Sequence, residues 1–197
     1  MVKIVDHEEK RRTIVKVTAY IIASEGMGAV TTRRIASETG CSLGILSHYF
    51  ANKDEIVLGA LNWCDARINE QLGEMYSEDF LSLDHFRDLF LMLLPLDEVS
   101  DTEWRVRINF VAHALTHPEL KQLREENLKY SYDIATKFVE KLQSEGGVRT
   151  DISAESLATN AVDMAFGLCV NLLNYPLRER RERVNELLDA LLKALLV

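Results

Sequence analysis

The sequence predicts an all-α protein. Its 197 residues include only 3 prolines and 9 glycines, so few residues interrupt regular structure. Apolar residues recur at helical spacing, and no stretch alternates apolar and polar residues over the length of a strand. Hydrophobic residues make up 47% and charged residues 27%, as is typical of globular proteins. These observations argue against global disorder and favour a bundle of long helices.

The first two helices are predicted from apolar spacing and helix-end signals. We expect a helix over about residues 8–25, followed by a break at the glycines near its end. Thr31 is the expected N-cap of a short second helix, whose inward face carries Ile35 and Ala36. Gly40 ends that helix, because glycine readily adopts the left-handed conformation.

A third short helix follows at once, and Ser42 is its expected N-cap. Four residues give it an inward face: Ile45, Leu46, Tyr49 and Phe50. Its outward residues are small or able to form hydrogen bonds, which suits the edges of bases in a major groove: Leu43, Gly44, Ser47 and His48. Two short helices joined by a glycine turn predict a helix-turn-helix. The alternative is a helical hairpin inside an ordinary bundle.

The long later helices begin with an N-terminal cap. Asn52 and Glu55 resemble a capping box that opens a helix over about residues 53–76. Four further helices are expected over residues 101–116, 119–144, 153–174 and 178–195.

Charge is divided unevenly along the chain. The net charge is −8, yet residues 1–53 hold eight basic and five acidic residues, whereas 15 basic and 26 acidic residues follow. Arg33 and Lys53 also lie near predicted helix N-termini, where backbone amides favour phosphate oxygens. A basic head on an acidic body therefore suggests that the head binds nucleic acid, although solvated helix faces alone produce such asymmetry.

Residues 12–61 resemble the DNA-binding domain of the TetR family of bacterial transcriptional regulators. The resemblance is carried by TTRRIA at 31–36 and GCSLGILSHYFANK at 40–53. Two residues depart from the family pattern, because Ser47 replaces a usual tyrosine and Cys41 a usual valine. GILSHYF, and more faintly the later EWRVRINFVAHALTHPELKQL, are similar to the branch of the choline-sensing betaine regulator.

The resemblance implies a homodimeric, ligand-responsive repressor that binds palindromic double-stranded operator DNA. It implies a DNA-binding domain over residues 1–53 and a ligand-binding and dimerisation domain over residues 54–197. The implied phosphate contacts are Thr32, Arg33, Tyr49 and Lys53, and the implied major-groove residues are Ser42, Leu43, Gly44, Ser47 and His48.

The effector is unknown, and its predicted contacts are polar or aromatic residues set in apolar helices. They are Trp63, Arg67, Trp104, Arg107, Phe110, His113 and Asp163. Each has an alternative role as an ordinary structural residue. Given the resemblance to the betaine regulator, the two tryptophans would frame a cage for a quaternary ammonium group.

Dense apolar stripes on the last two helices predict a homodimer interface. The stripes comprise Leu157, Ala161, Ala165, Leu168, Leu172, Val184, Leu188, Leu191 and Leu195. The alternative is that both stripes face the core of their own protomer.

Several other classes of function are disfavoured. The chain lacks a nucleophile elbow, a zinc-protease motif, a phosphate-binding loop and a dinucleotide fingerprint, so we do not expect an enzyme or a cofactor. His113 and His117 have metal-pair spacing, but Pro118 disfavours helix at His117, so no metal site is expected. Three scattered cysteines and the lack of a long apolar run favour a cytoplasmic protein without a membrane span. The remaining alternative is an all-α small-molecule binding bundle without a role at DNA.

Overall fold

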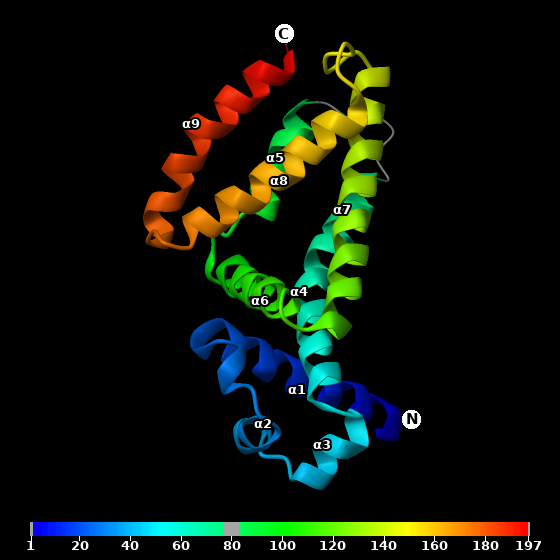
Figure 1. Ribbon diagram of the computed structural model, residues 1–197, viewed down its shortest axis with the longest axis vertical. Helices are drawn as coiled ribbons and strands as arrows, with labels where there is room; N and C mark the ends of the chain where they lie inside the picture. Colours follow the sequence, from blue (N-terminus) through cyan, green and yellow to red (C-terminus); the bar gives the residue numbers. More distant parts are fainter. Residues whose placement is uncertain (1, 77–82, 197) are drawn as a thin grey trace. The chain divides into compact units, whose positions relative to one another are not determined.

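The computed structural model describes residues 2–76 and 83–196, and this part of the chain is helical with short connections (Figure 1). The prediction of an all-α fold is confirmed. In order, the elements are α1 Val2–Glu25, the 3-10 helix η1 Met27–Ala29, α2 Thr32–Thr39, α3 Leu43–Tyr49, α4 Lys53–Tyr76, α5 Leu83–Leu93, α6 Glu98–Ala114, α7 Pro118–Ser144, α8 Ala154–Leu172 and α9 Leu177–Leu196.

The helices divide into two compact units. Unit 1 comprises Met1–Asn69 and Thr102–Thr116, and unit 2 comprises Glu70–Asp101 and His117–Val197. Helices α4 and α6 each run from one unit into the other, so they connect the units covalently. The functional boundary between residues 53 and 54 stays a prediction.

The core of unit 1 is formed by α1 with the short helices and the beginning of α4. Helix α1 packs on η1 and α2, and α2 packs on α3. Buried Ile14 and Ile35 belong to this core. Gly59 is required where α4 approaches α1, because a Cβ atom there would lie 2.6 Å from Cγ1 of Val15. The close approach fixes the first turns of α4 to the helix-turn-helix.

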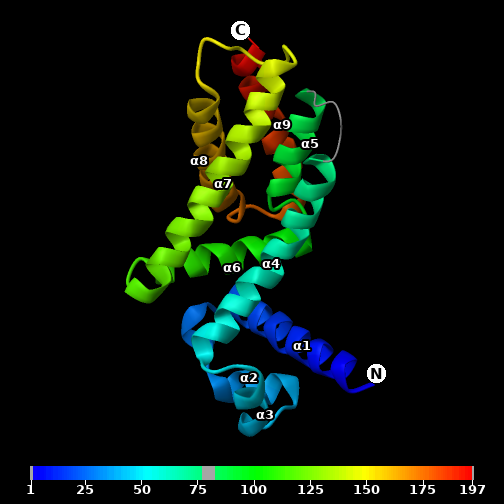
Figure 2. The same ribbon diagram turned by 90° about the vertical axis from the view of Figure 1, so that its right-hand side faces the viewer.

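Unit 2 is built around the packing of α7 on α8, with α5 beside them (Figure 2). Arg180, at the beginning of α9, is buried and donates to the carbonyl oxygens of Pro95 and Tyr175 at 2.7 and 2.8 Å. Its guanidinium also lies 2.6 Å from the carboxylate of Asp101. These bonds hold the beginning of α9 against the segment between α5 and α6.

Two helices differ from the sequence predictions. Helix α1 begins at Val2 rather than near residue 8. Residues 2–7 contain no proline or glycine that would interrupt the helix there. Helix α5 was not predicted as a separate element. Its apolar residues Leu83, Phe86, Leu89, Phe90 and Leu93 do recur at helical spacing, so the pattern that marks this helix was present but was not assigned.

Candidate nucleic-acid interface and effector pocket

The first helix of the helix-turn-helix presents one uncommitted cation. The Thr31 side chain accepts a hydrogen bond from the backbone N–H of Arg34 at 3.1 Å, which confirms the predicted N-cap. The Arg34 side chain is engaged, because it forms ion pairs with Glu25 and Glu38. Arg33 is exposed and forms no ion pair with any residue that the structure describes. Of the two neighbouring arginines, Arg33 is therefore the one available to a phosphate.

The turn and the second helix have the predicted local structure. Gly40 adopts the left-handed conformation at φ 64°, and Ser42 accepts a bond from the N–H of Ile45 at 3.2 Å. Leu46 and Phe50 are buried, as predicted. The exposed side of α3 carries Ser42, Leu43, Gly44, Ser47 and His48.

The prediction that Ile45 faces inward was wrong. Its side chain is 42% exposed, close to the 48% of Leu43. Helix α3 has only seven residues, and the step of about 100° from the buried Leu46 carries Ile45 off the narrow face that α2 covers. Ile45 thus adds a second exposed apolar side chain to the outward side of α3, one that sequence reasoning missed.

The corner between α3 and α4 is tied together by Arg11 of α1. The Arg11 guanidinium donates to the backbone carbonyl of Tyr49 and pairs with Glu55 at 3.0 Å. The same group lies over the ring of Phe50, 4.2 Å from its centroid. Arg11 thereby fixes the end of the exposed helix to α1.

The beginning of α4 has a variant of the predicted capping box. The side chain of Asn52 accepts from the N–H of Glu55 at 2.8 Å, while Glu55 accepts from the N–H of Ala51 at 2.6 Å rather than from Asn52. This backbone bond, with help from Arg11, holds the pKa of Glu55 below its usual value. Lys53 is the first residue of α4 and forms no ion pair within residues 2–76 and 83–196. It is the second uncommitted cation at a helix N-terminus.

His7 is a residue that the sequence analysis did not select. Its ring centroid lies 4.4 Å from that of Tyr49 and 5.7 Å from that of His48. The sequence contains a signal for this contact. No proline or glycine precedes residue 8, so α1 can begin early enough for His7 to reach α3. His7 therefore supports two of the residues assigned to DNA contact.

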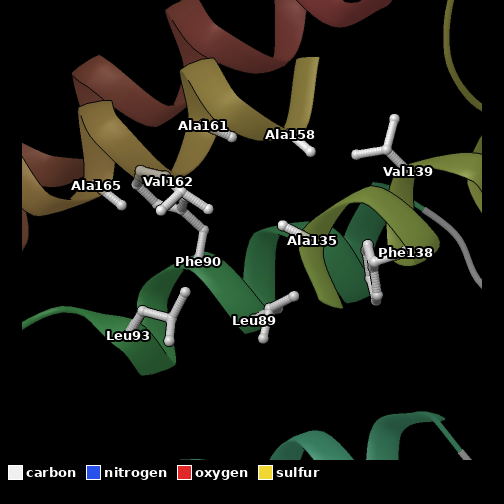
Figure 3. A pocket seen from close by; sticks show the side chains of 10 residues that line it. All are labelled: Leu89, Phe90, Leu93, Ala135, Phe138, Val139, Ala158, Ala161, Val162 and Ala165. Carbon is white, nitrogen blue, oxygen red and sulfur yellow. The ribbon is translucent and has the colours of Figure 1, made fainter. Parts of the chain in front are cut away.

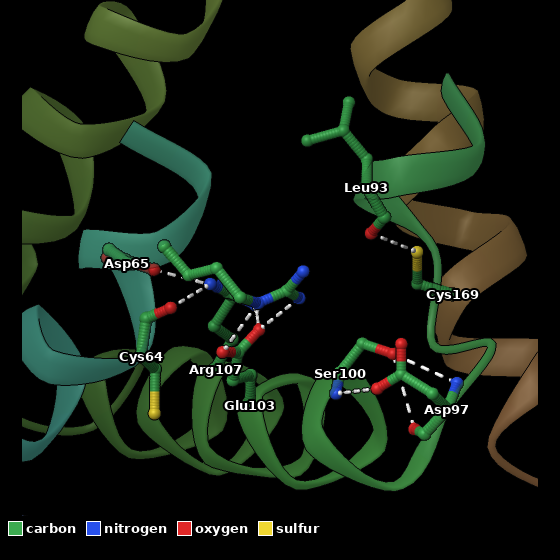
Figure 4. A network of polar contacts seen from close by, with 9 residues as sticks. Cys64, Asp65, Leu93, Asp97, Ser100, Glu103, Arg107 and Cys169 are labelled. Atoms are coloured by element: carbon green, nitrogen blue, oxygen red, sulfur yellow. Dashed lines mark hydrogen bonds and ion pairs between the residues drawn. The ribbon is translucent and has the colours of Figure 1, made fainter. Parts of the chain in front are cut away.

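Two of the predicted effector contacts form an ion-pair network in unit 1. Arg67 donates to both carboxylate oxygens of Glu103, at 3.1 and 2.7 Å, and the Glu103 side chain is only 4% exposed. Arg107 lies 2.7 Å from Asp65 and donates to the carbonyl of Cys64 at 2.8 Å (Figure 4). The network joins α4 to α6. Burial raises the pKa of the Cys64 thiol to about 12, so this thiol stays protonated at neutral pH.

In unit 1, the two tryptophans that were predicted to contact an effector already lie near cationic side chains of this chain. The Nζ atom of Lys16 lies 6.0 Å from the ring centroid of Trp63. The Arg107 guanidinium lies 5.4 Å from the ring centroid of Trp104, which is buried. Phe110 is buried as well, and His113 is half-buried. The structure does not bring these side chains together around a cavity that it describes.

A pocket of about 60 Å³ lies instead within unit 2, among α5, α7 and α8 (Figure 3). Its lining is entirely hydrocarbon: Leu89, Phe90, Leu93, Ala135, Phe138, Val139, Ala158, Ala161, Val162 and Ala165. None of the seven predicted effector residues lines it. Asp163 belongs to α8 but is exposed, and it accepts a hydrogen bond from the Tyr132 hydroxyl at 2.7 Å. Those seven assignments stay predictions.

The structure describes the burial of seven of the nine predicted dimer residues. The structure buries five of them inside a single protomer: Leu157, Ala165, Leu172, Val184 and Leu188. Ala161 and Ala165 line the pocket, Leu168 is half-buried, and the side chains of Leu191 and Leu195 lie outside the described residues. Burial of these five residues within one protomer is what the alternative predicts, and the dimer interface stays a prediction. The exposed apolar side chains of α8, α9 and their connection include Met164, Val170, Tyr175 and Leu187.

Comparison with known families decides the class of protein. Residues 83–197, more than half of the chain, match the family model described as "BetI-type transcriptional repressor, C-terminal". Residues 14–60 match the model described as "Bacterial regulatory proteins, tetR family". The chain belongs to the TetR family of transcriptional regulators. The predicted resemblance, including its branch, is confirmed.

Relatives and solved structures agree with this TetR-family assignment. The chain is 23% identical over 188 residues to the HTH-type transcriptional regulator PksA of Bacillus subtilis, covering 95% of this chain and 90% of PksA. A transcriptional regulator from Rhodococcus sp. Rha1 has a TM-score of 0.80 at 23% identity, covering 94% of this chain and 95% of that one. A regulator from Saccharomonospora viridis in complex with choline has a TM-score of 0.78 at 24% identity, covering 92% and 96%. At these identities the two structures show the fold of this regulator.

Within the described residues, no three or more His, Cys, Asp or Glu side chains cluster as a metal ion would require. Nor does any helix in the described ranges have the length and apolar character needed to cross a membrane.

Proposed function

We propose that this TetR-family regulator represses transcription by binding operator DNA as a homodimer, and that a small-molecule effector in unit 2 weakens this binding. The observation that carries the proposal is the exposed face of α3, flanked by two uncommitted cations, Arg33 and Lys53, at the N-termini of α2 and α4. Recognition helices read base edges while cations at helix ends hold the phosphates on either side.

Gly44 supports the proposal independently. Glycine in a helix costs about 1 kcal/mol relative to alanine, so its presence needs a reason. A Cβ atom at Gly44 would meet only the hydroxyl of Ser42, at an ordinary 3.8 Å. Nothing in the part of the chain that the structure describes requires glycine there. A close approach of the DNA backbone or base edges to α3 supplies the reason.

Individual roles follow from position along the interface. His48 and Ser47 are proposed to donate to base edges, and Leu43 with Ile45 to contact thymine methyl groups. Thr32, Arg33, Tyr49 and Lys53 are proposed to hold phosphates, and Ser42 and Gly44 to line the groove.

The effector is proposed to act through α4, which carries Lys53 at its N-terminus and passes from unit 1 into unit 2 after Asn69. The two heads of a dimer must present their recognition helices about 34–36 Å apart, or a multiple of one DNA turn. An effector that favours another arrangement of the units therefore lowers operator affinity. Operator DNA must lower effector affinity by the same factor, and tenfold corresponds to about 1.4 kcal/mol.

The dependence of DNA binding on salt tests the proposal. Because each phosphate contact releases counterions, Lys53→Ala should weaken binding to all duplexes alike and make the slope of log K against log salt shallower by about 1.8 for the dimer, or about 0.9 for each of its two lysines. His48→Ala should instead change which sequence is preferred. Lys121→Ala, which removes an exposed lysine from α7, is the matched control and should leave the slope unchanged. A wild-type protein with no salt-dependent binding to duplex DNA would favour the small-molecule binding bundle.

A further inference from the structure

The pocket in unit 2 has a chemistry that restricts its occupant. Its ten lining side chains come from three helices, and all of them are hydrocarbon (Figure 3). Four are alanines, and the space that larger side chains would fill is open. At about 60 Å³ the pocket exceeds the volume that one water molecule needs, but its side chains offer water no hydrogen bond.

Such a pocket binds hydrocarbon and rejects charge. Transfer of a methylene group from water to an apolar site strengthens binding about fourfold. A buried cation needs carboxylates, hydrogen-bond acceptors or aromatic faces around it, and here the only aromatic side chains are Phe90 and Phe138. An alkyl group therefore fits the lining, and a quaternary ammonium group does not.

The tryptophans offer no second place for a quaternary ammonium. Lys16 lies over Trp63, and Arg107 lies over Trp104, so each indole already has a cation of the chain against it. Glu103, the most buried carboxylate of that network, is engaged by Arg67 and Arg107. Trp63, Trp104 and Glu103 therefore already lie against cations of this chain.

We infer that the effector enters the pocket among α5, α7 and α8 through an alkyl chain or a similar hydrocarbon group, not through a quaternary ammonium group. The inference rests on the proposed function, in which an effector binds unit 2. It departs from what the BetI-type match and the choline-bound structure would suggest, and it makes pocket volume the determinant of specificity.

The test titrates full-length protein with the series from 1-propanol to 1-hexanol and, separately, with choline. Methyl resonances of Leu93, Val139 and Val162 report on the pocket itself. Their saturable shifts should give a Kd that falls about fourfold per added methylene until the pocket is full. Choline should leave these resonances in place. Choline shifts without alkanol shifts, or an alkanol affinity independent of chain length, would overturn the inference.

A pair of neighbouring substitutions localises the binding. Ala161→Leu fills the pocket and should weaken alkanol binding at least tenfold, whereas Asn160→Leu adds the same side chain on the exposed side of α8 and should leave it unchanged. Circular dichroism confirms that each variant is folded. Equal alkanol binding by wild type and Ala161→Leu would contradict the assigned site.

Operator binding by the same samples separates this inference from the proposed function. Salt-dependent DNA binding without alkanol binding would contradict the hydrocarbon site but would agree with the proposed function. Alkanol binding in the pocket without DNA binding would contradict the proposed function but would agree with the hydrocarbon site.

Discussion

Units 1 and 2 both have an apolar core, but they differ in how the surface assigned to function is held. In unit 1, directional bonds position the exposed helices, namely the caps at Thr31 and Ser42, the Arg11 contacts and the Arg67–Glu103 pair. In unit 2, the buried Arg180 fixes the beginning of α9, whereas the pocket is lined by apolar packing beside α7 and α8. A DNA-reading surface must match a fixed groove, so its geometry is specified by bonds. A pocket that accepts a hydrocarbon needs only shape and volume, and apolar packing supplies both.

The largest expected effect tests the ion-pair network of unit 1. Glu103→Ala leaves Arg67 without its carboxylate and leaves Asp65 as the one carboxylate of this network beside Arg107, so it should lower the free energy of unfolding by about 3–5 kcal/mol. Both tryptophans lie in unit 1, so urea unfolding followed by tryptophan fluorescence reports on this unit. Arg34→Ala, which breaks exposed ion pairs with Glu25 and Glu38 in unit 1, is the control and should cost about 0–1 kcal/mol. A loss below 1 kcal/mol for Glu103→Ala would remove the basis of the comparison.

The next effect tests the apolar packing of unit 2 with two adjacent leucines of α9. Leu188 is 1% exposed and Leu187 is 54% exposed. Leu188→Ala should destabilise the protein by about 2–5 kcal/mol, seen by circular dichroism, because it leaves a cavity in the core. Leu187→Ala should change the stability of the protomer by less than about 0.5 kcal/mol.

The same pair of variants locates the dimer interface. If α9 contacts a second copy, Leu187→Ala should weaken dimerisation in sedimentation measurements. Its melting temperature should then depend on protein concentration more strongly than that of the wild type. An effect of Leu187→Ala equal to that of Leu188→Ala at every concentration would place Leu187 in the core instead.

Local features of the structure could be predicted from the sequence, whereas contacts between distant residues could not, and the reason is physical. The caps at Thr31, Ser42 and Asn52 act on N–H groups three residues away, so a local pattern identifies them. The Arg67–Glu103 bonds join residues 36 apart, and no periodicity in one sequence pairs them. Arg67 was consequently assigned to an effector, although the structure shows it bound to Glu103.

The pocket and the dimer stripe were beyond prediction for a related reason. Apolar spacing identifies the inward face of α8 but not what lies opposite it, and another helix of the chain or a second copy would give the same pattern. Ala161 and Ala165 were therefore assigned to a dimer interface, which stays a prediction, and the structure places them in the lining of the pocket. The small size of these two alanines was a signal of open space. That signal can be interpreted only when the positions of α5 and α7 are known.

A smaller effect tests the cap of α3 and hence the positioning of the recognition surface. Ser42→Ala removes the acceptor for the N–H of Ile45 and should destabilise unit 1 by about 1 kcal/mol by tryptophan fluorescence. Ser47→Ala is matched in chemistry, but its hydroxyl bonds only to the carbonyl of Leu43, so its effect on stability should be within about 0.5 kcal/mol. Equal losses would mean that the bond to Ile45 does not fix the start of α3.

The smallest effect depends on pH and concerns Glu55 at the corner between α3 and α4. The N–H of Ala51, and then Arg11, lower the pKa of Glu55 below its ordinary value of 4.5. A carboxylate whose pKa is lower in the folded state stabilises the fold above its unfolded pKa, and this contribution disappears as the pH falls through the folded pKa. Glu55→Gln should therefore lower the melting temperature at pH 7, and its difference from wild type should close as the pH falls below 4.5. Glu125→Gln, which alters an exposed pair with Lys121 in α7, provides the control and should show little pH-dependent difference. If the difference in melting temperature between Glu55→Gln and wild type stayed constant from pH 7 to pH 3, packing and not charge would hold the corner between α3 and α4. Directional bonds would then not position the surface that is proposed to bind DNA.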